Sequence, residues 1–468
     1  MAIGSIPRTF EQSTVETLAA QMRGEVVLPS SPGYDEARAV YNAMIDKRPA
    51  VIARCHDVSD VMSALRFGRE HELQIAVRSG GHNVAGKGTC EGGMVIDLSL
   101  INGVHVEPAA RTVRVGGGAL WGDVDHATHA FGMATPSGII STTGVAGLTL
   151  GGGFGYLSRR YGLSLDNLLE ADVVTADGRF VTASENEHPD LFWALRGGGG
   201  NFGIVTSFKF RLHDVSTIYG GPIFYPVDQI DHLLRFYRDW IVDAPREISA
   251  FFAVHQGPPA PFIPEALHFV PAAAFVVCYT GDMSMAEEAV RPFREIAEPA
   301  LDLMSEMPYP MLQSLFDDLY TEGLQHYWKS DVIHGLPDEA LEVHTRHAPQ
   351  VPDPWSGIHI YPLNGAIHDT ASDATAFPFR DALGTHNILG VNPDPGVAPD
   401  RVAWVRRYYE DLRPYADPGG YVNFMADEEG ADRVQATYGD NYARLAQVKR
   451  AWDPDNVFQI NHNIIPAS

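Results

Sequence analysis

The feature that most limits what this chain can fold into is a series of glycine-rich segments between residues 78 and 205. Glycine lets backbone approach backbone or a ligand closely, and a run of free N–H groups can form an anion-binding nest. Loops of this kind could converge on a long, phosphate-bearing cofactor, although tight turns between short strands are the alternative. The segments are RSGGHN (78–83), VGGGALWGD (115–123), GVAGLTLGGGFG (144–155) and RGGGGNFGIV (196–205).

The pattern before these loops predicts a βαβ unit. Apolar runs at 49–55 and 74–80 read as strands, and the spacing over 58–73 is that of an amphipathic helix. Helical spacing also covers 12–23 and 34–46. Short β-rich runs separated by glycine turns follow, which is an α+β layout.

The composition changes near residue 216, where glycine becomes rarer, and a second domain is expected from there on. A chain of 468 residues is long enough for two or three domains. Strands are predicted at 272–280 and 357–363, and helices at 228–243, 284–297 and 399–413. The last segment predicts a helix that ends at Asp453, followed by an extended tail in which Phe458 looks buried.

The formal net charge of −25 argues against a nucleic-acid or anionic-membrane partner, because such a field repels phosphates. Three cysteines cannot form a disulfide framework and are read as reduced, partly buried thiols. The N-terminus lacks the apolar core of a signal peptide, and no run reaches the ~18 apolar residues of a membrane span. We therefore expect a soluble, cytoplasmic protein.

Two nucleotide-binding motifs are incomplete. Residues 81–88 match the first part of a phosphate loop, but Gly88 stands where a Ser or Thr must bind magnesium. Residues 198–203 fit G-x-G-x-x-G, which needs a strand before it and a helix after it. The order here is reversed, with helical DLFWALRG before and strand-like IVTSFKFRL after. Neither an NTPase nor a dinucleotide-binding Rossmann unit is predicted.

No metal site is predicted. His126 and His129 are three residues apart, but no HExxH and no Cys/His cluster with zinc spacing occurs.

His82 lies between Gly80-Gly81 and Asn83, so it faces whatever the loop holds. A neutral imidazole nitrogen can add to the activated 8-methyl group of an isoalloxazine and form a histidyl-flavin bond. A lone histidine is more often structural, but this chemistry needs a nucleophile in such a loop.

Several segments together resemble the FAD-linked oxidases of the vanillyl-alcohol-oxidase (PCMH) type. The tail at 442–466 resembles the C-terminal segment of berberine-bridge-like enzymes. Its N-x-N-I-x-P ending is similar to that of the 6-hydroxy-D-nicotine oxidase group, which carries only a histidyl link. The other segments are VRSGGHN (77–83), GGMVIDLSLINGV (92–104), TVRVGGGALWGDV (112–124), ATPSGIISTTGVAGLTLGGGFGYLSRRYGLSLDN (134–167) and RGGGGNFGIVTSF (196–208).

This resemblance implies a two-subdomain PCMH-type FAD-binding domain (1–215) and an α/β substrate domain with an antiparallel sheet (216–418). A berberine-bridge-like C-terminal segment (419–468) would return to the FAD domain. His82 would carry covalent FAD, and the other residues implied around FAD are Ser79, Gly80, Gly81, Asn83, Ser141, Thr142, Thr143, Gly144, Gly147, Gly152, Gly203, Ile204, Val205, Asn461 and Asn463.

The sequence departs from the doubly linked members of the family. Their second flavin link is a cysteine four residues before a glycine, and Ile140 stands at that position here. No second, cysteinyl link is therefore expected, and Cys90 is interpreted as structural.

For catalysis the resemblance implies Tyr421, in YVNF, and Asp369, eleven residues before Arg380. A tyrosine near its ordinary pKa of about 10 is a poor base at neutral pH, so Tyr421 could instead orient a substrate hydroxyl. A turn cap is the alternative for Asp369.

The expected activity is hydride transfer from an alcohol, amine or sugar-type small molecule to FAD, followed by reoxidation with O₂ to give H₂O₂. A dehydrogenase with another electron acceptor is the alternative, since Thr143 stands where this family controls oxygen access. A non-catalytic FAD-bearing protein is a third possibility. The single covalent link favours a small molecule or natural product, and the sequence predicts no oligomeric state.

Overall fold

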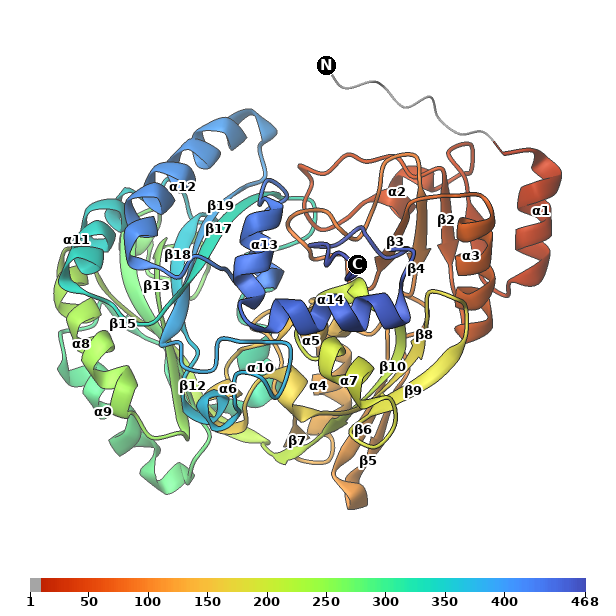
Figure 1. Cartoon of the computed structure of the whole chain (residues 1–468). Helices are drawn as coiled ribbons and strands as arrows, with labels where there is room; N and C mark the ends of the chain where they lie inside the picture. The colour runs from red at the N-terminus through yellow and green to blue at the C-terminus, as the bar shows by residue number, and fades with distance from the viewer. Residues whose placement is uncertain (1–9) are drawn as a thin grey trace.

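The structure is a computed structural model that describes residues 10–468. It has an α+β architecture built on three main sheets, which confirms the predicted fold class (Figure 1). A lobe with two smaller sheets lies beside a lobe built on one large antiparallel sheet, and helices α13 and α14 lie between the two lobes in this view (Figure 1). The domain bounds given above remain a prediction.

The first sheet contains the predicted βαβ unit. Strands β2 and β3 both pair in parallel with β4, which is inserted between them in the order β1-β2-β4-β3. Asp57 caps the connecting helix by accepting hydrogen bonds from two backbone N–H groups. The elements are α1 (Gln12–Gln21), β1 (Glu25–Val27), β2 (Val51–Arg54), α3 (Val58–Glu70), β3 (Ile75–Arg78) and β4 (Met94–Asp97).

The helix expected over 34–46 is wrong beyond its first turn, because α2 spans only Tyr34–Arg38. The following residues are held by contacts distant in sequence instead of by helical hydrogen bonds. The Asn42 amide donates to the carbonyls of Val84 at 2.8 Å and His326 at 2.9 Å, while Tyr41 N–H donates to the carbonyl of Gly81. Tertiary hydrogen bonding therefore outweighs local helical periodicity here.

The second sheet is antiparallel throughout, with the order β5-β6-β10-β8-β9. The helix α7 precedes β10, so the helix-then-strand order that excluded a Rossmann unit is confirmed. The elements of this region are β5 (Val104–Glu107), β6 (Thr112–Gly116), α4 (Trp121–His129), β7 (Met133–Ala134), α5 (Val145–Gly151), α6 (Ser158–Tyr161), β8 (Leu168–Val174), β9 (Phe180–Ser184), α7 (Pro189–Leu195), β10 (Ile204–Arg211) and β11 (His213–Asp214). Strands β7 and β11 pair with each other as a separate two-stranded sheet.

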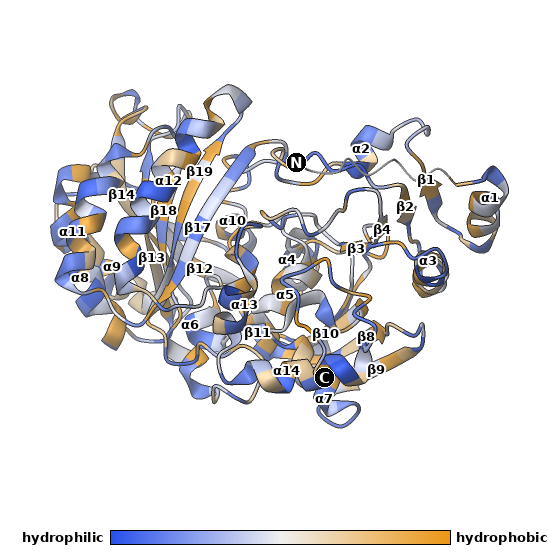
Figure 2. Ribbon diagram, turned by 45° about the horizontal axis from the view of Figure 1, so that its top comes forward, coloured by the Kyte–Doolittle hydropathy of each residue, from blue (hydrophilic) through white to orange (hydrophobic). Residues whose placement is uncertain are grey.

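The large sheet has the order β15-β12-β14-β13-β18-β19-β17, with β16 pairing to β12. Helices α8, α9, α11 and α12 cover its outer face (Figure 1), and the first three combine polar and apolar turns, as amphipathic helices do (Figure 2). The strands are β12 (Thr217–Pro226), β13 (Ile248–Gln256), β14 (Pro271–Tyr279), β15 (Leu301–Asp302), β16 (Ser305–Pro308), β17 (Gln325–Ile333), β18 (Gly357–Pro362) and β19 (Gly384–Asn392). The helices of this region are α8 (Ile230–Asp243), α9 (Ala286–Glu295), α10 (Tyr309–Gln313), α11 (Asp338–His347) and α12 (Ala398–Leu412).

Side chains of the large sheet alternate between two cores. On β18, Ile358 and Ile360 pack under the outer helices, whereas Tyr361 belongs to the cluster on the opposite face. Period-two alternation along a strand buried on both faces produces this division. The inner face thus presents a different set of residues toward the glycine-rich loops.

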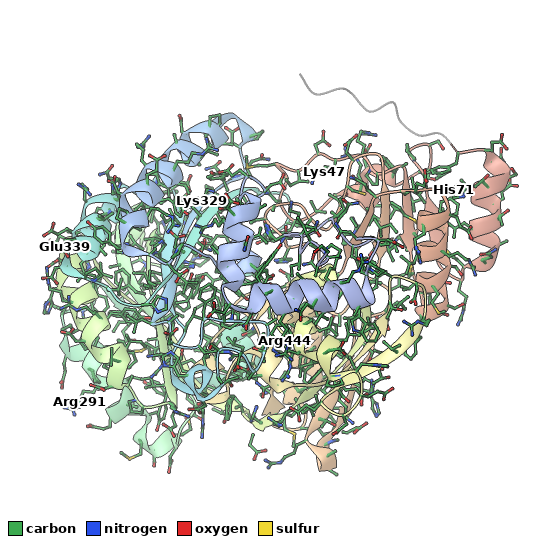
Figure 3. All side chains as sticks on the ribbon, in the orientation of Figure 1. Lys47, His71, Arg291, Lys329, Glu339 and Arg444 are labelled. Carbon is green, nitrogen blue, oxygen red and sulfur yellow. The ribbon has the colours of Figure 1, made fainter. Side chains whose placement is uncertain are left out.

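The C-terminal segment, with α13 (Ala431–Tyr438) and α14 (Asn441–Trp452), is fastened to both lobes. Lys329 of β17 lies beside α13 in Figure 3, and its ammonium group is 2.8 Å from Glu429. Arg444, on α14 in the same figure, lies 3.9 Å from the Trp193 ring. The predicted docking of the tail is confirmed, since Phe458 is buried.

Within residues 10–468 no helix is long and apolar enough to cross a membrane. In the same range no group of three or more His, Cys, Asp or Glu side chains could hold a metal ion. The three cysteines are free and buried, as predicted.

Candidate functional site

A large cavity lies where the glycine-rich loops meet the inner face of the large sheet. It contains about 1730 Å³ of space free of protein atoms, its open mouth included. The wall comes from loops 77–88 and 138–150, the turn 199–205, strands β17, β18 and β19, and residues 421–424 and 461–462. Three of the four glycine-rich segments therefore meet at one site, as the loop-convergence hypothesis expected. The fourth, 115–123, does not line the cavity, and its glycines 116–118 pack against neighbouring backbone instead.

Most residues predicted to surround a cofactor line this cavity. Four of the predicted residues do not line it, namely Ser141, Thr142, Gly152 and Asn463. Those on the wall are Ser79, Gly80, Gly81, His82, Asn83, Thr143, Gly144, Gly147, Gly203, Ile204, Val205 and Asn461.

His82 is held on three sides. Its ring stacks on Tyr41 with centroids 3.9 Å apart, and its Nε2 lies 3.1 Å from the Thr142 hydroxyl. Thr143 lies 3.5 Å from Nδ1. Burial lowers the pKa of His82 to about 4, so the imidazole is neutral at ordinary pH.

The turn that carries Thr142 and Thr143 is fixed by Asp317 of the other lobe. The Asp317 carboxylate accepts from the backbone N–H of Ser141 at 2.9 Å and also from its hydroxyl. The orientation of His82 therefore depends on both lobes.

Two glycine loops touch backbone to backbone. A Cβ at Gly80 would lie 2.5 Å from the Gly144 nitrogen, and one at Gly144 would lie 2.4 Å from the Gly80 nitrogen. No other residue fits at either position without moving the loops. A Cβ at Gly147, by contrast, would meet no protein atom within 4 Å.

The C-terminal tail closes the other end of the cavity. Asn461 donates to the Gly200 carbonyl at 2.9 Å, and the Lys449 ammonium donates to the Asn201 carbonyl at 2.8 Å. Lys449 also pairs with Asp453 at 2.6 Å, and both side chains are fully buried. This ion pair fastens the tail to the 198–203 turn.

Several buried polar atoms on the wall have no partner in the protein. They are Ser79 Oγ, Trp328 Nε1, Asn387 Oδ1 and His462 Nε2. The Oδ1 atom of Asn463, which does not line the cavity, is also unsatisfied. Buried polar groups are rarely left unpaired, so these atoms fit an extended ligand with polar groups along its length.

Tyr421 lies on the wall and accepts two hydrogen bonds at its phenol oxygen. They come from the Gly153 N–H at 2.9 Å and the Asn423 amide at 2.8 Å. Burial raises the pKa of Tyr421 to about 12. The tyrosine thus stays protonated, which favours the orienting role over that of a base. Gly152 lies against it, because a Cβ there would be 2.9 Å from the Tyr421 ring.

Asp369 is placed outside the cavity, so its assignment as a catalytic acid or base needs correction. It ends a short 3₁₀ turn, and its carboxylate pairs with the Arg246 guanidinium through contacts of 2.5 and 2.8 Å. Its side chain is 57% exposed. The pKa of Asp369 is lowered, chiefly by the hydrogen bond from Arg246.

Sequence reasoning missed the residues that the large sheet contributes. Alternation in GIHIYP and FFAVHQ would have placed the imidazoles on the face opposite the isoleucines, since period two separates the faces. The missed wall residues include Tyr320, Asn387, Leu389 and His462, whereas Trp328, His359 and Tyr361 belong to aromatic segments that could line a pocket but more often form a core.

Comparisons with known proteins agree with this geometry. A family described as FAD binding domain matches residues 49–184, and one described as berberine and berberine like matches 420–465. The (R)-6-hydroxynicotine oxidase of Paenarthrobacter nicotinovorans is 31% identical over 458 residues, covering 95% of this chain and 97% of that protein. An FAD-linked oxidoreductase of Dictyostelium discoideum is 30% identical over 431 residues, covering 91% of each.

The chain belongs to the berberine-bridge-like FAD-linked oxidoreductases. The crystal structure of 6-hydroxy-D-nicotine oxidase from Arthrobacter nicotinovorans superimposes on this oxidoreductase with a TM-score of 0.85 at 28% identity, covering 95% of this chain and 98% of that one. A xylooligosaccharide oxidase from Myceliophthora thermophila, solved with xylobiose, gives 0.85 at 25% identity, covering 97% and 99%. The resemblance read from the motifs is therefore confirmed.

Proposed function

We propose that this oxidoreductase is an oxidase that holds FAD covalently through His82 and oxidises a neutral, flat, hydroxyl-bearing small molecule. The observation that supports it best is one cavity with a neutral imidazole between two glycine loops at one place and the hydrogen-bonded phenol of Tyr421 at another.

The residues on the wall fit FAD. The glycine turns at 79–83, 144–147 and 199–203 offer backbone N–H groups to the pyrophosphate, and Asn461 and His462 offer polar atoms from the tail. FAD, when bound, supplies the two-electron acceptor that takes hydride from the substrate carbon. The chain's own groups must orient the substrate and accept its proton.

The environment of His82 suits covalent attachment. Attack on the flavin 8-methyl carbon needs an unprotonated nitrogen, and the low pKa of His82 keeps the ring neutral. Tyr41 fixes the plane of the ring, and Thr142 fixes its rotation. Ile140 cannot provide a second bond, so one link is proposed.

The substrate part of the cavity is mostly aromatic. Among the described residues, no Asp or Glu lines the cavity, and the rings of Phe154, Trp328, Tyr361 and Phe424 form much of its wall. Aromatic walls favour flat apolar molecules, and the absence of a carboxylate among the described lining residues disfavours a cationic substrate. An aryl or allylic alcohol fits this chemistry better than a polyol, which would need more hydrogen-bond partners.

A peroxide screen under air tests the activity. The panel contains cinnamyl alcohol and 1-phenylethanol as neutral aryl alcohols, xylobiose as a sugar and 6-hydroxynicotine as an amine. We expect the aryl alcohols to bleach the flavin anaerobically and to give H₂O₂ under air. Bleaching without peroxide would indicate a dehydrogenase. Failure of every compound to bleach the flavin would contradict the proposal.

A further inference from the structure

Four side chains form a hydrogen-bonded chain behind the substrate part of the cavity. The Tyr361 hydroxyl contacts Nδ1 of His359, and Nε2 of His359 lies 2.6 Å from Nε2 of His255. The Tyr320 hydroxyl is 3.5 Å from the same His255 nitrogen. Tyr320, His359 and Tyr361 line the cavity, whereas His255 does not.

Strand pairing builds this chain. Ala253 of β13 is the register partner of His359 on β18, so His255 lies two residues further along, next to Gly357. A Cβ at Gly357 would lie 2.2 Å from the His255 ring. Only glycine at this position leaves room for the imidazole to reach His359.

The contacts require an ordered set of protons. Two Nε2 atoms that face each other at 2.6 Å share one proton. If Tyr361 donates to Nδ1 of His359, then Nε2 of His359 carries the shared proton and donates it to His255. His359 is then both an acceptor at Nδ1 and a donor at Nε2, which is the arrangement that passes a proton on.

The direction of the chain leads away from the cavity. His359 and Tyr361 are buried, and His255, at the end of β13, is partly exposed but has a buried Nδ1 atom. Because no carboxylate lines the cavity within the described residues, a substrate proton must go to a phenol or an imidazole.

We propose that Tyr361 accepts the proton of the substrate hydroxyl and that His359 and His255 relay a proton outward. Tyr361 is the catalytic residue, and the two histidines act through it as positioning residues. This inference rests on the proposed alcohol oxidation.

The bonds balance as follows. The carbon of the substrate loses hydride to FAD, and the hydroxyl proton moves to the Tyr361 oxygen. The original Tyr361 proton moves to Nδ1 of His359, and the Nε2 proton of His359 moves to His255. The product is a carbonyl compound, and the proton remains on His255, which becomes an imidazolium.

The surroundings keep the relay neutral before reaction. Burial lowers the pKa of His359, and the neighbouring His255 lowers the pKa of His359 further. Burial also lowers the pKa of His255 to about 4, opposed by the Ser356 and Pro354 backbone and by Asp353. Facing the relay from other elements, Tyr320 and Tyr156 are phenols whose pKa burial raises.

The first test needs no substrate. In holoenzyme labelled with ¹⁵N-histidine, NMR should show His359 protonated at Nε2 and unprotonated at Nδ1. Tyr361→Phe should shift the Nδ1 signal of His359. A proton found on Nδ1 of His359 would overturn the relay, because Tyr361 could not then donate to it.

The second test is chemical rescue, measured as the rate of anaerobic flavin reduction by cinnamyl alcohol. His359→Ala and Tyr361→Phe should each slow reduction by at least about 100-fold, the lower range of proton-transfer catalysis. Imidazole should restore much of the His359→Ala rate, whereas 1-methylimidazole, which has no N–H to pass on, should not. Equal rescue by both compounds, or an unchanged rate, would overturn the relay and leave the proposed function standing.

The chain offers a matched control. The buried pair His344 and Tyr408 has the same contact, 2.7 Å between Nδ1 and the phenol oxygen, but lies under the outer helices. Tyr408→Phe should leave flavin reduction unchanged. If no compound of the panel reduces the wild-type flavin, the proposed function fails and the NMR result alone decides the relay.

Discussion

The phenol oxygen of Tyr421 lies 2.8 Å from the amide nitrogen of Asn423, two residues along the same short turn. Together with the Gly153 N–H, this bond occupies the oxygen as an acceptor and leaves the phenol proton free to point into the cavity. Tyr421 is therefore arranged to donate a hydrogen bond to a ligand.

We predict that Tyr421→Phe slows anaerobic flavin reduction by roughly 10-fold, the effect of losing one hydrogen bond of about 1.5 kcal/mol. Because the pKa of Tyr421 is raised to about 12, the wild-type rate should show no loss as pH passes 10. Stopped-flow reduction across a pH series measures both effects. A rate that falls with a midpoint near 10 would contradict the protonated role of Tyr421.

Asp369→Asn should leave flavin reduction and stability nearly unchanged. Its pair with Arg246 is exposed, and exposed pairs contribute about 0–1 kcal/mol. The melting temperature and the reduction rate of the variant, compared with those of Arg246→Ala, check this. A large loss of rate in Asp369→Asn alone would restore Asp369 as a catalytic candidate.

Gly147→Leu should fold but fail to bind FAD. A side chain at Gly147 meets no protein atom within 4 Å yet lies on the cavity wall, so it would occupy the space for the cofactor. Gly335, which also has no atom within 4 Å but lies off the wall, provides the control variant Gly335→Leu. Circular dichroism reports the fold, and visible absorbance reports flavin. Normal flavin content in Gly147→Leu would contradict this placement of the cofactor.

Stability should fall as pH drops below about 6.5. Burial lowers the pKa of His326, His344 and His359 in the folded state. Below pH 6.5 the unfolded chain therefore binds protons at these histidines that the folded protein does not bind. Their contribution is complete above the unfolded pKa of 6.5 and is lost as pH falls, by up to about 1.4 kcal/mol per pH unit for each group. Urea unfolding at pH 7, 6 and 5 measures it, and equal free energies at the three values would contradict it.

The cofactor side of the site could be predicted from the sequence because its signals are local. Glycine at Gly80 and Gly144 is required by backbone contact, and His82 follows directly within one of these loops. The βαβ unit was predictable for the same reason, since its periodicity is contained within 49–80. Even so, only the fold reveals that Asp317 of the other lobe supports the 141–144 turn.

The substrate side could not be predicted in the same way. Its relay depends on the register of β13 against β18, which no local pattern specifies. The resemblance implies Asp369 at the family's acidic position, eleven residues before Arg380, but these two residues have different partners. Arg380 pairs with Asp166 and Asp369 with Arg246.

The central claim is that His82 is the covalent anchor of FAD. The most direct measurement is mass spectrometry of the peptide that spans residue 82. The peptide is taken from three denatured proteins, namely the wild type, His82→Ala and the surface control His126→Ala. We predict a flavin adduct on His82 in the wild type and in His126→Ala, and flavin released from His82→Ala. An unmodified His82 in wild-type protein that binds FAD, or an adduct on another residue, would contradict the account.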